Sequence, residues 1–227
     1  MNGNVDAYTF YLSNDAKNGM MADSAYRSAK YGIEYTEWDY IIIQQVSQNA
    51  GVPSSYENLQ GVIDYINTYK NEGAEIFWHM TWAYQSDSTH AGFANFGNDQ
   101  MAMYNAIVST LRSTVLTNSN IKGFIPVGTA IQNLRTSDLG DTLTRDGYHL
   151  SNGIGRYTAA LTWFAALTGC SVDGVTATPE AYPEVATYLD HIKDAVKNAI
   201  SAPFEITVSA YAPAEISALL VRNEEDA

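Results

Sequence analysis

The chain has 227 residues, 46% of them hydrophobic, and a formal net charge of −13 at pH 7. This length and apolar content predict one domain with a full core. The acidic balance argues against nucleic acid and anionic membranes as partners, and no stretch approaches the length of a membrane span. A lone Cys170 excludes a disulfide framework and a cysteine-based zinc site. The histidines show no metal-binding spacing, so we expect neither a metal nor a cofactor.

The first third of the chain alternates strand-forming and helix-forming segments. Residues 8–12 are rich in strand formers, and a helix is predicted from Asp23 or Ser24 to about Tyr35. Residues 38–45 are typical of a buried strand, because three successive isoleucines leave no polar face. Ser54 to Glu57 form a capping box that predicts the start of the next helix.

The remainder continues the same alternation. Two further apolar strands, three amphipathic helices and a final strand are predicted, in chain order at residues 74–80 (strand), 98–116 (helix), 121–127 (strand), 152–168 (helix), 178–203 (helix) and 204–211 (strand). The helix at 152–168 has Ser151 as its N-cap and Gly169 as its C-cap. The last helix is predicted to open at Thr178-Pro179, with proline at its first position.

Apolar strands that alternate with amphipathic helices predict an α/β fold, a three-layer α/β/α sandwich with a mainly parallel sheet. We assign residues 1–203 to this domain and residues 204–227 to a C-terminal strand and tail. Ligands bind at the carboxyl ends of the strands in such sheets. Polar segments follow all three predicted apolar strands, at residues 44–49, 81–84 and 145–151.

The third of these segments, Arg145-Asp146-Gly147-Tyr148-His149-Leu150-Ser151, places an acid three residues before a histidine. A carboxylate beside a histidine fixes the ring's tautomer and stabilises the imidazolium, as in the base half of a hydrolytic triad. The alternative is that Asp146 is a turn residue and His149 an incidental polar group, since D-x-x-H is short and common.

Three segments together resemble the SGNH (GDSL-like) hydrolase superfamily, in particular a branch described as a domain of unknown function. They are this loop, residues 38–47 and residues 125–130. The resemblance covers roughly Tyr8 to Pro203 and implies a flavodoxin-like sheet. It also implies a serine esterase whose substrate is a small-molecule or carbohydrate ester. Removal of acetyl groups from a carbohydrate is one such activity.

Site residues follow from the resemblance, residue by residue. Asp146 and His149 match the acid and base. Gln45 and Ser47 stand where the superfamily places its oxyanion asparagine, although ordinary loop capping is the alternative for both. Trp82 follows the second apolar strand and would stack on a sugar ring, or else serve as a core aromatic.

One part of the family pattern is missing. The superfamily begins with a strand ending in a Gly-Asn-Ser or Gly-Asp-Ser turn, then a helix and a second strand, and nothing before Trp38 matches this unit. We therefore expect an N-terminally truncated domain without its serine nucleophile, inactive on its own. The strand at Ile41 to Ile43 would then lack a neighbour, and such an apolar edge predicts self-association.

Two other functions stay open. The chain could be a non-catalytic SGNH-like domain that binds a glycan or a partner, or Ser47 or Ser13 could act as a substitute nucleophile. A Gly-Asn-Ser turn encoded upstream of Met1 would favour the esterase.

Overall fold

A computed structural model describes residues 9–11 and 26–214. Strands β1 (Thr9–Tyr11) and β2 (Tyr26–Ser28) form an antiparallel pair, and the short helix α2 (Ala29–Glu34) follows. A second sheet consists of β3 (Tyr40–Ile43), β4 (Glu75–His79) and β5 (Ile121–Ile125). All pairings in this sheet are parallel and its order is β3-β4-β5, as consecutive β–α units require.

Helices connect and cover these strands. They are α3 (Leu59–Tyr69), α4 (Gln100–Thr110), α5 (Val127–Arg135), α6 (Ile154–Thr168), α7 (Glu184–Thr187) and α8 (Leu189–Ser201). A π-helical turn, Leu111–Val115, extends α4, so the helix predicted at 98–116 is confirmed with an irregular last turn. Gly169 ends α6 in the left-handed conformation, as predicted for its C-cap. The predicted N-cap is wrong: Gly153 occupies that position, and the Ser151 hydroxyl instead accepts the Gly155 amide at 2.9 Å.

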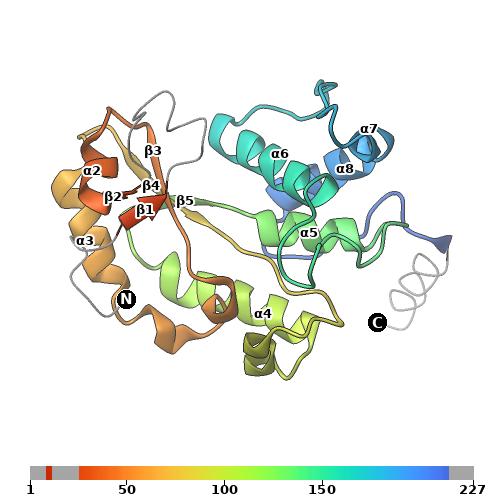
Figure 1. Ribbon diagram of the computed structural model, residues 1–227, viewed down its shortest axis with the longest axis horizontal. Helices are drawn as coiled ribbons and strands as arrows, with labels where there is room; N and C mark the ends of the chain where they lie inside the picture. Colours follow the sequence, from red (N-terminus) through yellow and green to blue (C-terminus); the bar gives the residue numbers. More distant parts are fainter. Residues whose placement is uncertain (1–8, 12–25, 215–227) are drawn as a thin grey trace.

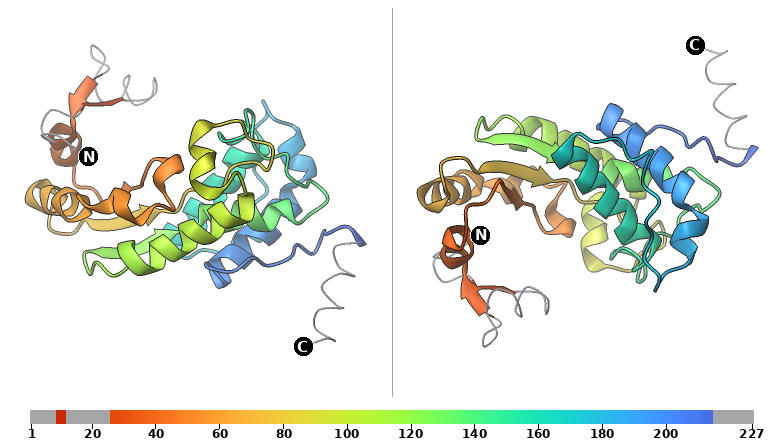
Figure 2. Two further views of the ribbon diagram at one scale, coloured as in Figure 1. Left: turned by 90° about the horizontal axis from the view of Figure 1, so that it is seen from below. Right: turned by 90° about the horizontal axis from the view of Figure 1, so that it is seen from above.

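The two faces of the sheet are covered by different helices (Figures 1 and 2). On one face, α3 and α4 pack their buried residues against Ile76 and Trp78 of β4. On the other face lies a second core formed mainly by α5, α6 and α8, which Ile42 of β3 also contacts. The predicted three-layer α/β architecture with a parallel sheet is therefore confirmed.

Strand β3 differs from the buried strand that its isoleucines predict. Its only hydrogen-bonded neighbour among the described residues is β4, so it forms an edge of the sheet. Ile41, Ile42 and Ile43 are accordingly only half-buried, and Tyr40 is 37% exposed. The structure thus leaves an apolar strand edge without a partner among the residues it describes.

Two local predictions in the N-terminal third are wrong or only partly met. Tyr26 lies in β2 rather than on a helix, while Asp23 and Ser24 fall outside the described residues. The capping box at Ser54 to Glu57 does not form. Instead, Pro53–Tyr56 is a 3-10 turn, and the Ser55 hydroxyl donates to the Val52 carbonyl at 2.7 Å. Pro53 fixes the backbone of this turn, which delays the helix to Leu59.

Two predictions near the C-terminus are also wrong. The segment after Thr178 is a turn, and helix begins only at Glu184, because Pro183 would interrupt a helix that started at Pro179. Residues 204–211 form no strand. The amides of Thr207 and Ser209 instead donate to side-chain oxygens of Asn133 and Thr136, both at 2.8 Å.

Candidate functional site

The loop that carries Asp146 and His149 is a tight hairpin. Thr144 and Leu150 form an antiparallel bridge at its base, and the Arg145 amide donates to the His149 carbonyl at 2.9 Å. Gly147 at the tip has a φ of 87°, which a side chain would strain, and an added Cβ would lie 3.1 Å from Ser88. The hairpin turns Asp146 and His149 to the same side.

Asp146 holds the His149 ring directly. Its Oδ2 lies 2.7 Å from Nδ1, and its Oδ1 accepts the amides of His149 and Tyr148 at 2.7 and 3.2 Å. Desolvation raises the pKa of Asp146, but the hydrogen bonds from the His149 ring and from the two amides outweigh it and lower the pKa to about 2. Asp146 is therefore a carboxylate at neutral pH, and the neutral ring carries its proton on Nδ1.

This arrangement frees the other ring nitrogen. Within the described part of the chain, Nε2 of His149 has no hydrogen-bond partner, and the side chain is 50% exposed. A bare imidazole nitrogen backed by a carboxylate is suited to accept a proton from an attacking hydroxyl group or from water.

His149 lines a pocket of about 250 Å³ between the carboxyl end of β4 and the first turns of α6. Its other lining residues are His79, Trp82, Arg145, Leu150, Arg156 and Ala159. The Trp82 indole donates to the Tyr148 carbonyl at 2.7 Å, which ties the hairpin to the segment after β4. The predicted residues Asp146, His149 and Trp82 are thus brought together.

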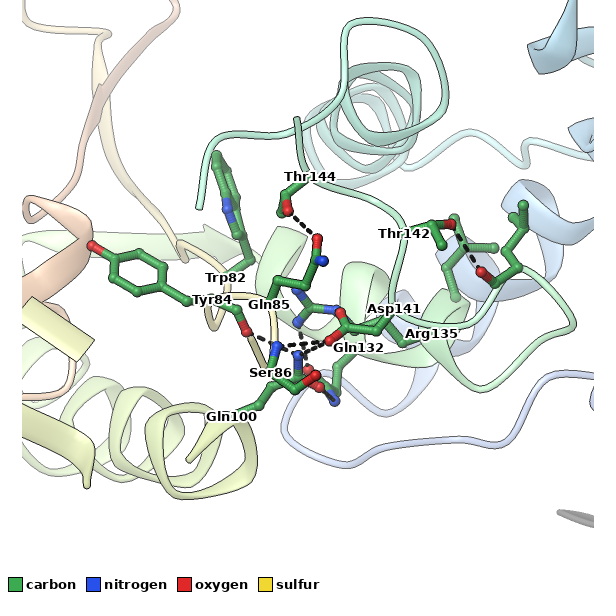
Figure 3. A network of polar contacts seen from close by, with 12 residues as sticks. Trp82, Tyr84, Gln85, Ser86, Gln100, Gln132, Arg135, Asp141, Thr142 and Thr144 are labelled. Atoms are coloured by element: carbon green, nitrogen blue, oxygen red, sulfur yellow. Dashed lines mark hydrogen bonds and ion pairs between the residues drawn. The ribbon is translucent and has the colours of Figure 1, made fainter. Parts of the chain in front are cut away.

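A partly buried polar network, with the buried Arg135 and Gln132 in its interior, lies next to the hairpin (Figure 3). The Asp141 carboxylate accepts from the Ser86 amide at 2.7 Å and from Gln100 Nε2 at 2.9 Å, and it lies 2.8 Å from Nε of the buried Arg135. The backbone N–H of Gln85 donates to the Gly147 carbonyl at 2.8 Å, and the side-chain oxygen of Gln85 accepts from the Thr144 hydroxyl. These contacts link α4, α5 and the segment after β4 to the hairpin, so the acid and base are held in place before any ligand binds.

Gln45 lies in a different environment from His149. Its Nε2 donates to Ser55 O and Oγ at 3.0 and 3.1 Å, and its Oε1 accepts the Val46 amide at 2.9 Å. Gln45 lines a separate hollow together with Ser55 and Trp78. Both of its amide hydrogens are therefore engaged, and its oxyanion role stays a prediction that requires this side chain to turn.

Ser47 reaches the hairpin only indirectly. Its hydroxyl lies 2.9 Å from the buried Tyr84 hydroxyl, and the Tyr84 ring packs against that of Tyr148 with centroids 5.7 Å apart. No hydrogen bond joins Ser47 to the His149 ring. The role of Ser47 likewise stays a prediction.

His79 is a pocket residue for which no role was predicted. It is 6% exposed, and burial lowers its pKa to about 4, so the ring is neutral at pH 7. Its Nδ1 accepts the Trp163 indole N–H at 2.9 Å, which leaves the proton on Nε2. Arg145 and Arg156 are the other missed residues. A usable signal was that two of the chain's twelve basic residues lie within seven positions of His149.

Other binding features are few. No group of three or more His, Cys, Asp or Glu side chains in the described ranges could hold a metal ion. Residues 9–11 and 26–214 also contain no helix long and apolar enough to cross a membrane.

Comparisons with known proteins place the chain in a family. The model for the "Domain of unknown function (DUF4886)" matches residues 1–199. The crystal structure of a DUF4886 family protein from Bacteroides uniformis ATCC 8492 is 39% identical, with a TM-score of 0.74, over 79% of this chain and 69% of that one. None of the curated proteins matches the chain. The chain therefore belongs to the DUF4886 family.

Proposed function

We propose that this site is that of an SGNH-type acyl hydrolase that removes acyl groups, such as acetyl, from a carbohydrate. The observation that carries the proposal is the 2.7 Å contact between Asp146 and Nδ1 of His149, with Nε2 left free beside a pocket. The resemblance of the D-x-x-H loop to the SGNH superfamily supports the same chemistry.

The roles in the reaction follow from the geometry. Nε2 of His149 takes the proton of the attacking hydroxyl as the new acyl bond forms, and later returns it to the leaving alcohol. Asp146 stabilises the imidazolium between these two transfers. Trp82 presents half-buried aromatic surface for a sugar ring, and its indole N–H is already committed to Tyr148.

No candidate nucleophile bonds to His149 in the part of the chain that the structure describes. In the described residues, no serine, threonine or cysteine side chain hydrogen-bonds its ring. We therefore expect this chain to leave unactivated sugar acetates intact. An activated ester such as p-nitrophenyl acetate should still react slowly, because histidine can itself attack a reactive acyl group.

The test compares p-nitrophenyl acetate hydrolysis by the wild-type chain, His149→Ala and Asp146→Asn. The control is His191→Gln, since His191 lies outside the pocket and contacts Asp138 at 3.2 Å. We expect His149→Ala to lose at least about tenfold in rate and the control to retain it. Mass spectrometry of quenched protein would place the acetyl group on His149 or on a serine. Equal rates for wild type and His149→Ala would contradict the proposal.

A second candidate is a non-catalytic domain that binds a glycan or a partner at the same surface. The engagement of Ser47 by Tyr84 favours it, because this hydroxyl is then not presented to His149. Sugar binding combined with equal rates in the assay above would select this candidate.

A further inference from the structure

Positive charge gathers in the His149 pocket, although the chain as a whole carries a net charge of −13. Arg145 stands immediately before Asp146 in the hairpin, and Arg156 lies in the first turn of α6. Both line the pocket beside His149. The positive end of the helix dipole of α6 adds a field of the same sign.

Arg156 stands out among the basic residues whose side chains the structure describes. The others each have a partner: Arg135 and the lysines 193 and 197 contact carboxylates, Lys70 and Lys122 contact carbonyls, and Lys30 and Arg112 lie over aromatic rings. The guanidinium of Arg156 is exposed and has no hydrogen bond, ion pair or aromatic contact within residues 9–11 and 26–214. Its five donors are available to a ligand.

Arg145 is partly neutralised but held in position. Its Nη1 donates to Asn152 Oδ1 at 3.2 Å, and its Nε lies 3.8 Å from Asp146 Oδ2. Both Asp146 oxygens are occupied by the His149 ring and by backbone amides. The pocket therefore offers N–H donors on Arg145, Arg156 and His79, and its remaining walls are Trp82, Leu150 and Ala159.

We propose that this pocket binds a substrate carrying an oxyanion, either a carboxylate or a sulfate, with Arg156 as its principal partner and Arg145 beside it. A guanidinium matches both groups through two parallel hydrogen bonds. The pocket's volume of about 250 Å³ is at the small end for ligand sites and suits one sugar residue. The inference rests on the proposed function and narrows it to acylated acidic sugars.

Binding of unesterified sugars tests this inference without requiring hydrolysis. The probes are methyl β-D-glucuronide, glucose 6-sulfate and the neutral methyl β-D-glucoside. The readout is the NMR signal of the Trp82 indole N–H, assigned with Trp82→Phe. At low ionic strength we expect at least one charged probe to bind about tenfold more tightly than the glucoside, and salt to reduce this preference. A preference for one charged probe identifies the group as carboxylate or sulfate.

Variants assign the preference to its residues. Arg156→Gln should reduce binding of the charged probe to the level of the glucoside, and Arg145→Gln should reduce it less. Arg112→Gln, an exposed arginine over the Phe204 ring, is the matched control and should bind like wild type. Because the Arg156 side chain has no hydrogen bond, ion pair or aromatic contact within the described residues, its replacement should leave the thermal unfolding midpoint nearly unchanged, and the variant remains interpretable.

Several outcomes would overturn the inference: no binding of either charged probe, equal binding of neutral and charged probes, or a preference that survives Arg156→Gln. These are separable from failure of the proposed function. Charged-sugar binding without His149-dependent hydrolysis would keep the anion site and remove the esterase. His149-dependent hydrolysis without a charge preference would do the reverse.

Discussion

Strand β3 pairs with β4 along its whole length, yet the surroundings of the two strands differ. β4 lies between two strands, and Ile76, Trp78 and His79 are buried. β3 has a strand on one side only within the described residues, and its isoleucines are half-buried. The segments that follow the two strands also differ in how firmly they are bonded to the rest of the protein.

The segment after β4 is bonded to the hairpin through Trp82 and Gln85. The segment after β3 is bonded mainly to its own neighbours, as Gln45 is to Ser55. Asp146 and His149 are therefore held by contacts with the interior of the protein. Gln45, which was predicted to bind the oxyanion, is bonded to Ser55 instead.

The largest effect is expected when the contacts of Asp141 beside the hairpin are removed. Asp141→Ala would leave the buried Arg135 charge without its carboxylate partner. We expect the free energy of unfolding, measured by urea titration, to fall by about 3 kcal/mol. The control is Asp173→Ala, whose contact with Lys197 is exposed and whose loss should leave the urea midpoint nearly unchanged. Similar shifts in the two variants would contradict a special role for the network around the buried Arg135.

The buried end of β4 also predicts a pH dependence. Burial lowers the pKa of His79 to about 4 from 6.5, so between these values the unfolded chain binds a proton that the folded chain does not. Stability should therefore fall as the pH drops through this window, by roughly 3 kcal/mol at its lower end. The lowered pKa of Asp146 also contributes to the free energy of unfolding, but this contribution is lost only as the pH falls from the ordinary pKa of 3.8 toward 2. It therefore does not overlap with the effect of His79.

Urea midpoints at pH 7 and about pH 4.5 check the assignment to His79. The variant His79→Gln keeps an acceptor for the Trp163 indole, and it should show a flatter dependence. An unchanged slope in the variant would assign the effect to other groups.

Strand β3, at the edge of the sheet within the described residues, predicts self-association. We expect the 1–227 chain to self-associate through the β3 edge, since an apolar strand without a neighbour pairs readily. Tyr40→Lys should raise the dissociation constant about tenfold, and Phe164→Lys, at a similarly exposed position on α6, should not. Sedimentation velocity at several concentrations measures this. A monodisperse monomer that unfolds cooperatively would refute the prediction.

The smallest expected effect concerns the link between β4 and the hairpin. Trp82→Phe removes the indole bond to Tyr148, and Trp38→Phe removes a comparable bond of 2.9 Å to Gly32, so each should cost about 1 kcal/mol. Only Trp82→Phe should accelerate amide hydrogen exchange at Tyr148 and His149. Equal exchange in the two variants would show that Trp82 does not order the hairpin.

The layered fold was predictable because its signals are local and repeated. The apolar runs of β4 and β5 and the amphipathic segment at residues 152–168 each predict the element that forms. The errors had two causes. A tertiary partner overrode a local pattern at Thr207 and Ser209, which bond to side chains of α5 and its C-cap instead of forming a strand. Elsewhere a local signal was misread, because Pro53 and Pro183 displaced the predicted helix starts.

The contact between Asp146 and His149 was predictable because both residues lie in one short loop. Trp82 was predicted from its place after a strand. Arg156 and His79 were missed because their approach to His149 depends on how α6 crosses the end of β4, which spacing in the sequence does not encode.

The most direct test of the central claim is the tautomer of His149, measured by ¹⁵N NMR at about pH 8, where an ordinary histidine is neutral. The geometry predicts the proton on Nδ1, shared with Asp146, and a bare Nε2 facing the pocket. The Asp146→Asn variant should lose this preference. If the wild-type ring instead carries its proton on Nε2, His149 is not poised as a base, and the proposed chemistry fails with it.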